Sequence, residues 1–407
     1  MSSVCSVVHE PMDAETTLTP FLRGKIHVRQ PKRGYRFNVD TVALAAFSWV
    51  RDGETVLDLG TGSGILLLLL GHFHHPGRLV GVELQENLAA MAAANLKDNG
   101  WSDRGQVLYT DLRDPRAIEP GTCDLVVSNP PYHEAGRGQT SATPERALAR
   151  QSFSAELPDV ASAASRTMTP DGRFCVVAPV ARLGDLMAAV GATGLHPRLL
   201  RYVQDRPGAQ AHLVMLQSGR TMGRGCITLP PLVLKDPDGS YAEEMRHWLA
   251  HDPPQTPRFL CDCMLGTLAR YLRLSGCDAG YFRKAEDNWL MGECARAGHV
   301  LLTRDRPLLA RCAKTGVEAL DPGSDVPAEQ FRRVREAFGQ PTGSTDPRCL
   351  RCNAPTVPVP REEAMGKVPP YTYLTHRRFN ACPCCGKLTW EGSHLERFRE
   401  TVRKLGS

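Results

Sequence analysis

The sequence predicts an α/β protein whose first part contains a mostly parallel sheet, followed by a smaller α/β domain and a cysteine-bearing segment. Between residues 34 and 217, short Val- and Leu-rich runs such as "TVLDLG" and "RLVGVEL" alternate with Ala-rich helical stretches. This alternation is typical of a parallel sheet covered by helices on both faces. A second pattern of strands and helices follows residue 257, and two CxxC pairs follow residue 346.

Composition limits the class of protein. A chain of 407 residues is too long for one ordinary core, and 42% hydrophobic and 23% charged residues are typical of a soluble globular protein. No window contains the roughly 18 consecutive apolar residues of a membrane helix, and the first residues lack the pattern of a secretory signal. We therefore expect a cytoplasmic protein without a membrane partner, and nothing in the sequence points to a protein partner.

Charge and cysteine are unevenly distributed. Residues 257–407 hold 24 Lys and Arg against 17 Asp and Glu, whereas residues 1–256 hold 25 against 27. A basic carboxyl-terminal part fits a nucleic-acid partner, although a mildly basic surface can also be merely solvated. Four of the 14 cysteines form the two CxxC pairs, which favours metal binding over disulfides in a chain without an export signal.

Breaker-rich segments suggest the domain boundaries. The stretch "HDPPQTP" at 251–257 is polar and stiff, so we interpret it as a linker. The predicted domains are then residues 1–250, residues 258–345 and the cysteine-bearing residues 346–407.

The segment "ETVLDLGTGSGILLLLL" predicts a strand, a glycine turn and the start of a helix. Gly60, Gly62 and Gly64 allow a ligand to approach the backbone, and the helix offers free N–H groups at its amino end. A glycine turn alone also fits an ordinary strand–helix loop or a dinucleotide site.

Three carboxylates at successive strand ends extend this turn. Asp58 lies in the turn, Glu83 ends the next strand and Asp111 follows the third. Open α/β sheets bind ligands along this edge. We assign Asp58 and Glu83 to the amino-acid part and the ribose hydroxyls of S-adenosylmethionine, and Asp111 to its adenine amine.

The sequence "NPPY" at residues 129–132 follows another buried strand, "CDLVVS". By itself it also fits an ordinary proline turn. Together with the glycine turn it resembles the class I amino-methyltransferases, which methylate adenine N6, cytosine N4 or glutamine N5. The resemblance implies a Rossmann-like fold with a mostly parallel seven-stranded sheet. It also implies that Asn129, which lies beside the cofactor, and the Pro130 carbonyl accept the hydrogens of the target amine, while Tyr132 stacks on the target.

Two flanking stretches resemble one subgroup, the tRNA1(Val) adenine-37 N6-methyltransferases. They are "GYRFNVDTVALAAF" at 34–47 and "ATPERALARQSF" at 142–153. The resemblance implies methylation of adenine N6 in RNA, most simply tRNA. Glutamine methyltransferases, which act on proteins, share "NPPY" but carry an extra helical domain that is not evident here, so they are the alternative.

Basic residues near this site suggest tRNA contacts. We hypothesise that Arg146 and Arg150 contact phosphates, although their spacing also suits a solvated face. The basic residues of the leader are further candidates, and these are Arg23, Lys25, Arg29, Lys32 and Arg33. The histidines of "GHFHHPG" lie at a predicted helix end without a cysteine or carboxylate nearby, so we do not predict a metal site there.

The segments "RFLCDCMLGTLARYLRLSG" and "HVLLTRDRPLL" resemble the PIN-like ribonuclease domain called the Mut-seven C-terminal domain. Asp262 and Asp305 each follow a predicted strand, and with Asp278 or Asp287 they would hold Mg²⁺ or Mn²⁺ for phosphodiester hydrolysis. A domain that only binds RNA is the alternative. A further alternative is a ribonuclease that uses the first domain to select its substrate.

The two CxxC pairs have the spacing of a zinc ribbon. Cys349, Cys352, Cys382 and Cys385 are the predicted zinc ligands, because each pair presents two thiolates at tetrahedral angles. Cys384 lies between two of them and could replace a neighbour as a ligand, but a solvent-facing thiol is the expectation. Cys261 and Cys263 are expected to be packed thiols. The ribbon is interpreted as structural, with RNA contact by Arg377, Arg378 and Lys387 as an addition.

Overall fold

The structure is a computed structural model, and it describes residues 16–31, 39–130, 155–221, 225–250, 258–339, 347–390, 392 and 400. The chain divides into two compact units. Unit 1 comprises residues 1–50 and 54–250, and unit 2 comprises residues 51–53 and 251–407. The proposed linker at 251–257 lies outside the described residues, so the domain boundaries drawn from the sequence stay predictions.

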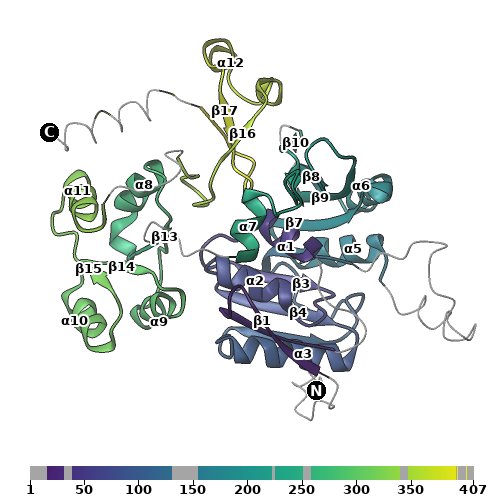
Figure 1. Cartoon of the computed structure of the whole chain (residues 1–407), viewed down its shortest axis with the longest axis horizontal. Helices are drawn as coiled ribbons and strands as arrows, with labels where there is room; N and C mark the ends of the chain where they lie inside the picture. Colours follow the sequence, from purple (N-terminus) through teal and green to yellow (C-terminus); the bar gives the residue numbers. More distant parts are fainter. Residues whose placement is uncertain are drawn as a thin grey trace, which may run out of the picture. The chain divides into compact units, whose positions relative to one another are not determined.

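Unit 1 is built on one large sheet with the strand order β10-β8-β9-β7-β6-β3-β4-β5, and β11 pairs with β8 (Figure 1). Neighbours from β5 to β7 are parallel, and β9 runs antiparallel to β7 and β8. The mostly parallel sheet of seven long strands is therefore confirmed, with two short strands added at its edge. The strands are β3 Thr55–Leu59, β4 Arg78–Glu83, β5 Gly105–Tyr109, β6 Cys123–Ser128, β7 Met168–Pro179, β8 His196–Gln204, β9 Ala211–Gly219, β10 Ile227–Thr228 and β11 Leu232–Val233.

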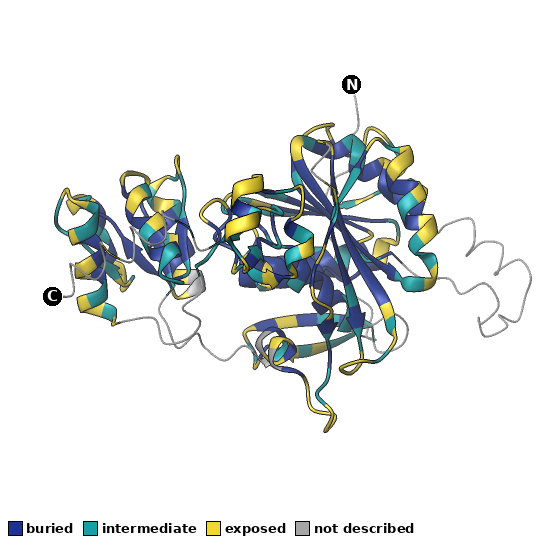
Figure 2. Cartoon of the chain, turned by 90° about the horizontal axis from the view of Figure 1, so that it is seen from above, coloured by how far each residue is buried: buried dark blue, intermediate teal, exposed yellow. Residues whose placement is uncertain are grey.

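Helices cover both faces of this sheet, as the sequence pattern predicts. On one face, α1 packs on α2, and α2 packs on α3; on the other, α5 packs on α6. The strands are buried along most of their length, whereas the helices keep exposed outer sides (Figure 2). The helices are α1 Val39–Phe47, α2 Ile65–Phe73, α3 Glu86–Asp98, α5 Leu157–Thr167, α6 Leu183–Ala192 and α7 Glu243–Ala250.

The core beneath α5 and α6 follows the two-residue period of the strands. Leu57 and Leu59 of β3 and Val126 of β6 lie in one buried cluster with apolar residues of α5 and α6. Asp58, between the two leucines, therefore faces away from this cluster. The alternation places apolar side chains in the core and leaves the carboxylate on the side of α2.

A buried ion pair holds the amino-terminal end of the sheet. Arg173 of β7 donates from Nη1 and Nη2 to the two carboxylate oxygens of Glu54, at 2.7 Å each, and from Nη2 to the Trp49 carbonyl at 2.9 Å. Breaking such a pair from one side typically costs about 3–5 kcal/mol, because the other charge stays buried. The pair therefore belongs to the structure of the sheet, far from the strand ends where ligands bind.

The leader forms a β-hairpin of β1 Thr16–Phe21 and β2 Ile26–Pro31. Two asparagines one helical turn apart, Asn95 of α3 and Asn99 directly after it, bind the backbone of β2. Asn95 Oδ1 accepts from Arg29 N–H at 2.7 Å, and Asn99 Oδ1 accepts from His27 N–H at 2.9 Å. Their amide nitrogens donate back to the carbonyls of Arg29 and His27. The hairpin is thus fixed to α3 through the free edge of β2.

Unit 2 contains a small sheet whose four strands are parallel, in the order β13-β12-β14-β15. Buried apolar residues from both faces of the strands form two clusters, one shared with α8 and α11 and the other with α9 and α10. The α/β pattern predicted after residue 257 is confirmed. The elements are β12 Phe259–Cys261, η2 Cys263–Leu265, α8 Gly266–Leu274, β13 Ala279–Tyr281, α9 Asp287–Ala297, β14 Val300–Leu302, α10 Arg306–Thr315, β15 Ala319–Leu320 and α11 Pro327–Phe338.

The cysteine-bearing segment adds an antiparallel sheet of three strands. Its strands are β16 Val357–Val359, β17 Phe379–Ala381 and β18 Leu388–Trp390. Between β16 and β17 the chain forms η3 Arg361–Ala364 and α12 Pro370–Thr375. Each cysteine pair lies next to one of these strands, so the sheet fixes the two pairs relative to each other.

No helix in the described part of the chain combines the length and the apolar character needed to cross a membrane.

Candidate active site and candidate metal centre

The glycine turn joins the end of β3 to the start of α2. Gly60 and Gly64 have φ angles of +77° and +82°, which side chains with a Cβ rarely adopt. The N–H groups of Gly60 and Thr61 donate to the Val82 carbonyl of β4, both at 2.9 Å. Among the described residues, no heavy atom lies within 4 Å of the position that a Cβ on Gly60 would take. The turn is therefore rigid and leaves open space where a ligand can approach the backbone.

Asp58 lies at the base of this turn and is almost completely buried. Its Oδ2 accepts a hydrogen bond of 2.8 Å from Thr61 Oγ1. Burial raises the pKa of the Asp58 carboxyl from 3.8 to about 7, the Thr61 hydrogen bond opposes this rise, and the nearby Glu83 adds to it. A carboxylate in such a place is favoured by a cationic partner, and the ammonium group of an amino acid is one.

Glu83 ends β4 and holds the loops on both sides of it. Its Oε2 accepts from Gly62 N–H and its Oε1 accepts from Gln85 N–H, each at 2.9 Å. Both carboxylate oxygens keep further lone pairs for hydroxyl groups of a ligand.

Asp111 follows β5 and is partly exposed. It accepts from Arg113 Nε at 2.9 Å and from the Arg113 backbone at 2.9 Å. These hydrogen bonds, the side-chain one first, lower the pKa of Asp111, so it carries a negative charge at neutral pH. Asp58, Glu83 and Asp111 thus lie at the carboxyl ends of three adjacent strands, as predicted.

Asn129 directly follows β6, which is the neighbour of β3 on the other side. Its Nδ2 donates to Thr41 Oγ1 of α1 at 3.0 Å, and this bond fixes the orientation of the amide. Ser128 Oγ donates to the Leu59 carbonyl at 2.8 Å, which ties the ends of β6 and β3 together. The strand order reverses between β3 and β6, and doubly wound sheets bind ligands at such a point.

Pro130 is described and follows Asn129, whereas Pro131 and Tyr132 lie outside the described residues. The same is true of Arg146 and Arg150, and of Lys32 and Arg33 in the leader. Their predicted roles stay predictions.

The described basic residues of the leader lie in and beside the β1–β2 turn. Arg23 and Lys25 are exposed, and Arg23 has a φ of +54°. Arg29 is partly exposed and forms an ion pair with Asp98 at 2.8 Å. The geometry therefore presents Arg23 and Lys25 to solvent, while Arg29 serves the attachment of the hairpin to α3.

The histidines that we excluded as metal ligands lie where the sequence places them, at the carboxyl end of α2. His74 and His75 are buried, and the His74 ring lies 4.5 Å from the Trp49 ring in an edge contact. Among the described residues, they belong to no cluster that could hold a metal ion.

In unit 2, Asp262 follows β12 and Asp305 lies three residues beyond β14, so both are at the carboxyl edge of the small sheet. Thr303 connects them, because its Oγ1 donates to Asp262 Oδ2 at 2.8 Å and accepts from Asp305 N–H at 3.0 Å. Asp305 also caps α10 by accepting from Leu308 N–H at 3.0 Å. The strand order reverses here between β12 and β14, and open α/β sheets commonly bind ligands at such a point.

The two other acidic residues that we predicted as metal ligands, Asp287 and Asp278, lie at different places in unit 2. Asp287 begins α9 and forms an ion pair with Arg311 of α10 at 3.1 Å. Asp278 precedes β13, at the amino edge of the sheet, where its Oδ1 accepts from Asn353 Nδ2 at 2.6 Å. The sheet thus separates Asp278 from Asp262, and among the described residues no three carboxylates are gathered as a metal cluster.

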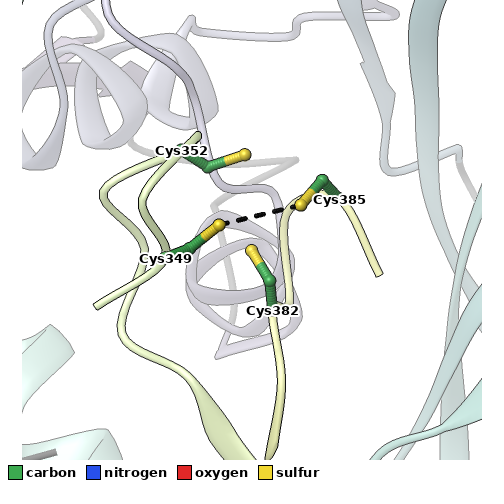
Figure 3. A group of neighbouring side chains, drawn as sticks. All are labelled: Cys349, Cys352, Cys382 and Cys385. Atoms are coloured by element: carbon green, nitrogen blue, oxygen red, sulfur yellow. Dashed lines mark hydrogen bonds between the residues drawn. The ribbon is translucent and has the colours of Figure 1, made fainter. Parts of the chain in front are cut away.

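The four predicted metal-binding cysteines converge. The sulfur atoms of Cys349, Cys352, Cys382 and Cys385 lie within 4.8 Å of one another and point toward a common centre (Figure 3). Cys349 Sγ and Cys385 Sγ are 3.8 Å apart. The four thiols hydrogen-bond to one another, which lowers the pKa of Cys349 and raises the pKa of Cys385. This donor set is able to hold a metal ion.

Two expectations about the remaining cysteines are wrong. Cys384, expected to face solvent, has no exposed surface. Its side chain points inward, although it lies in a tight turn between two predicted metal ligands. The CxxC spacing gives no indication of this burial. Cys261 is packed in the core as expected, whereas Cys263 is exposed at the start of η2. Every cysteine in the described residues is a free thiol.

Two residues of the site carry no signal in the sequence that marks them in advance. In the sequence, Thr41 looks like any threonine of a helix. Its contact with Asn129 arises because the fold brings the end of β6 beside α1. Asn95 is buried, and its Nδ2 donates to the Ser63 carbonyl in the glycine turn at 2.8 Å in addition to its bonds with β2. Its position on the buried side of α3 is the one clue, because a buried asparagine needs partners.

Comparisons with known proteins agree with this geometry. A family model described as "Methyltransferase small domain" matches residues 39–180, and one described as "Mut7-C RNAse domain" matches residues 257–402. The tRNA1(Val) (adenine(37)-N6)-methyltransferase of Aeromonas salmonicida is 30% identical over 220 residues, which are 54% of this chain and 90% of that protein. The enzyme of the same name from Shigella sonnei is 30% identical over 209 residues, 51% of this chain and 84% of that protein. A solved structure, of a predicted O-methyltransferase from Agrobacterium tumefaciens, matches with a TM-score of 0.42 and 17% identity, covering 51% of this chain and 94% of that one.

The sheet, the glycine turn and the first family match define an S-adenosylmethionine-dependent methyltransferase. Through this part, the chain belongs to the family of the tRNA1(Val) (adenine(37)-N6)-methyltransferases. The part of the chain that follows, residues 257–402, matches the family model of the Mut7-C RNAse domain.

Proposed function

We propose that this protein methylates the N6 atom of an adenine in tRNA. The observation that carries the proposal is the position of Asn129. It lies at the point where the strand order reverses, across from the glycine turn, with its amide nitrogen bonded to Thr41. The names of the relatives support tRNA as the substrate, and tRNA1(Val) is the first tRNA to test.

The residues at this edge suit the cofactor. Asp58 offers a buried carboxylate to an ammonium group, Glu83 offers acceptors to ribose hydroxyls, and Asp111 offers an acceptor to an adenine amine. The glycine turn leaves space between them. When bound, S-adenosylmethionine supplies an electrophilic methyl group on a positively charged sulfur.

Asn129 and Pro130 would prepare the target amine. The lone pair of an adenine amine is delocalised into the ring, so the amine is a weak nucleophile. Acceptors at Asn129 Oδ1 and the Pro130 carbonyl would hold its two hydrogens and favour a tetrahedral nitrogen with a localised lone pair. Because Thr41 accepts from Nδ2, the amide has a fixed orientation, and Oδ1 is the atom that would accept from the amine. The nitrogen would gain a bond to the methyl carbon while the bond from that carbon to the cofactor's sulfur breaks, which leaves a neutral thioether, and the nitrogen would lose one proton to solvent.

Replacing Asn129 tests this role. Asn129→Ala should lower methyl transfer about 100-fold or more, because an acceptor that acts during the reaction is lost. Total tRNA is incubated with isotopically labelled cofactor, and its nucleosides are analysed by mass spectrometry for labelled N6-methyladenosine. Affinity for S-adenosylmethionine, measured by calorimetry, should change little.

The matched control is Asn288→Ala, which removes an asparagine of unit 2 that bonds Arg311. It should leave methyl transfer unchanged. Full activity of Asn129→Ala would refute the proposed role. Label found on a protein glutamine instead of RNA would replace adenine methylation by the alternative reaction.

For the four-cysteine centre we propose zinc. Four thiolates from two CxxC pairs match the tetrahedral coordination that structural zinc sites use. The ribbon's small sheet is too short to be stable without such a centre, so the metal serves the fold.

A second candidate function is RNA cleavage by unit 2. It is supported by Asp262 and Asp305, joined through Thr303 at the carboxyl edge of the small sheet, and by the match to a Mut7-C RNAse domain. Two carboxylates at this edge would position a divalent metal ion and a water molecule. The full chain is incubated with Mn²⁺ and a labelled oligoribonucleotide. Cleavage that Asp262→Asn abolishes would support this function, whereas intact RNA in both samples would leave unit 2 an RNA-binding module.

A further inference from the structure

The segment between the two cysteine pairs contains a short helix with two distinct faces. Helix α12 begins at Pro370, directly after Pro369, and ends where His376 N–H caps the Thr372 carbonyl at 3.0 Å. Tyr371 and Leu374 are three residues apart, so they lie on the same face. Each is 76% exposed, a large fraction for an apolar or aromatic side chain.

The other face of α12 anchors the helix. Tyr373 stacks on Phe379 of β17, with ring centroids 6.4 Å apart and planes 19° apart. The Arg361 guanidinium lies 4.3 Å above the Tyr373 ring, and Arg361 Nη2 donates to the Tyr373 carbonyl at 2.7 Å. Thr372 is buried as well. The fold of the segment therefore rests on Tyr373 and its neighbours, and the exposure of Tyr371 and Leu374 needs another reason.

The charges beside the exposed face are mainly positive. Arg377 and Arg378 follow the capping residue His376 at the end of the helix, and both are exposed. One of the two acidic residues in the segment, Glu363, is paired with Lys367 at 2.9 Å, which leaves Glu362 as the exposed acidic residue. An aromatic ring and an apolar side chain next to two exposed arginines suit a partner with flat rings and negative charges.

We propose that Tyr371, Leu374, Arg377 and Arg378 form a surface, the α12 surface, that binds single-stranded RNA. A base stacks on the Tyr371 ring with Leu374 beside it, and the two arginines contact phosphates. Unpaired RNA fits better than duplex RNA, because a base must expose its face to stack. The proposal rests on the proposed function in one respect, because a protein that methylates RNA must also bind RNA. It adds a binding site distant in sequence from the methyl-transfer residues.

Binding by variants of the full, metal-loaded chain tests the α12 surface. The probe is a fluorescein-labelled oligoribonucleotide of 12 mixed-sequence bases, and binding is followed by fluorescence anisotropy without cofactor or divalent ions. Tyr371→Ala should weaken binding about 5- to 100-fold, the range measured for loss of one stacked aromatic side chain. Tyr371→Phe keeps the ring and should stay within about twofold of the native chain.

The contribution of the two arginines can be measured separately through the salt dependence of RNA binding. In the double variant Arg377→Gln, Arg378→Gln, the slope of log K against log salt should become shallower by about 1.4, because two phosphate contacts are lost. The same oligonucleotide annealed to its complement should bind more weakly than the single strand. Tyr241→Ala is the control, since Tyr241 is a 44% exposed tyrosine of unit 1, and it should bind like the native chain. Equal metal content shows that each variant keeps its ribbon.

Unchanged binding in Tyr371→Ala would overturn the proposal. So would a concentration-dependent self-association that Tyr371→Ala abolishes while RNA binding persists, because the surface would then bind a second copy. Methyl transfer to tRNA is measured in parallel. A chain that binds RNA through Tyr371 but transfers no methyl group would refute the proposed function and retain the α12 surface. A chain that methylates tRNA and binds the oligonucleotide independently of Tyr371 would refute the α12 surface and retain the proposed function.

Discussion

At the scale of single residues, the buried carboxyl of Asp58 makes cofactor binding depend on pH. Burial raises its pKa to about 7, and only the carboxylate pairs with an ammonium group. Affinity for S-adenosylmethionine should therefore rise about tenfold per pH unit from pH 5 to pH 7 and then level off. Calorimetry in two buffers of different ionisation enthalpy should show a proton released on binding in this range.

Asp58→Asn is the matched variant, because it keeps the shape and the hydrogen bond from Thr61 but has no charge to titrate. It should bind the cofactor more weakly and with no pH dependence below 7. A pH dependence that survives in Asp58→Asn would assign the titration to another group.

The same carboxyl affects stability in the opposite sense. In the unfolded chain the group has its ordinary pKa of 3.8, so the folded chain holds the proton over a range where the unfolded chain has lost it. The stabilisation from this proton is complete below pH 4 and is lost as the pH rises toward 7. A bound cationic ligand would offset this loss.

The residues proposed to bind the cofactor, the target amine or the metal could be predicted from the sequence. The residues that form hydrogen bonds with them could not. Asn129, the three carboxylates and the four cysteines stand in motifs whose spacing is meaningful. Thr41 is 88 positions from Asn129, and Asn95 is 66 positions from Arg29. Contacts over such distances follow from the packing of helices on the sheet, which one sequence without relatives does not specify.

At the scale of elements, α3 connects the leader hairpin to the glycine turn through Asn95. Asn95→Ala removes bonds to β2 and to the Ser63 carbonyl, and each buried group left without a partner costs about 1–3 kcal/mol. We expect a lower melting temperature together with a weaker affinity for S-adenosylmethionine. Thermal unfolding and calorimetry measure the two effects.

Asn99→Ala is the matched control, since Asn99 bonds β2 at His27 but does not reach the glycine turn. It should loosen the hairpin and leave cofactor affinity unchanged. Equal loss of affinity in both variants would mean that the hairpin, rather than the bond to Ser63, supports the turn.

The strands that the sequence did not predict are those that contain polar or charged residues. Strand β8 contains Arg201, which reads as a surface residue, yet Arg201 is nearly buried because Glu244 of α7 accepts two hydrogen bonds from it at 2.7 Å each. The β1–β2 hairpin was missed for a similar reason, because its edge is satisfied by Asn95 and Asn99 rather than by another strand. Strands such as β3 and β6 were predictable, since their apolar residues alone account for their burial.

At the scale of the whole molecule, each unit has its own core, so removal of the metal should act on one unit. A chelator should release one equivalent of metal, detected with a chromogenic dye, and lower the thermal stability of unit 2. Methyl transfer to tRNA should persist, because no residue of the four-cysteine centre belongs to the proposed cofactor site. Loss of both together would contradict this independence.

Two cysteine variants complete the test. Cys382→Ser should abolish metal binding, whereas Cys384→Ser, at a neighbouring buried thiol, should retain it. Metal loss in Cys384→Ser as well would make the fifth thiol part of the centre.

The cysteine knuckle is also joined to the small parallel sheet. Asn353, one residue after Cys352, has a φ of +59° and directs its amide to Asp278 Oδ1 and to the Ala279 N–H of β13. Arg273 of α8 donates to the Leu350 carbonyl at 2.9 Å within the knuckle itself. Folding of the small parallel sheet is thereby coupled to metal binding at the four-cysteine centre, so that depletion of the ion would expose the helices on this sheet to proteolysis.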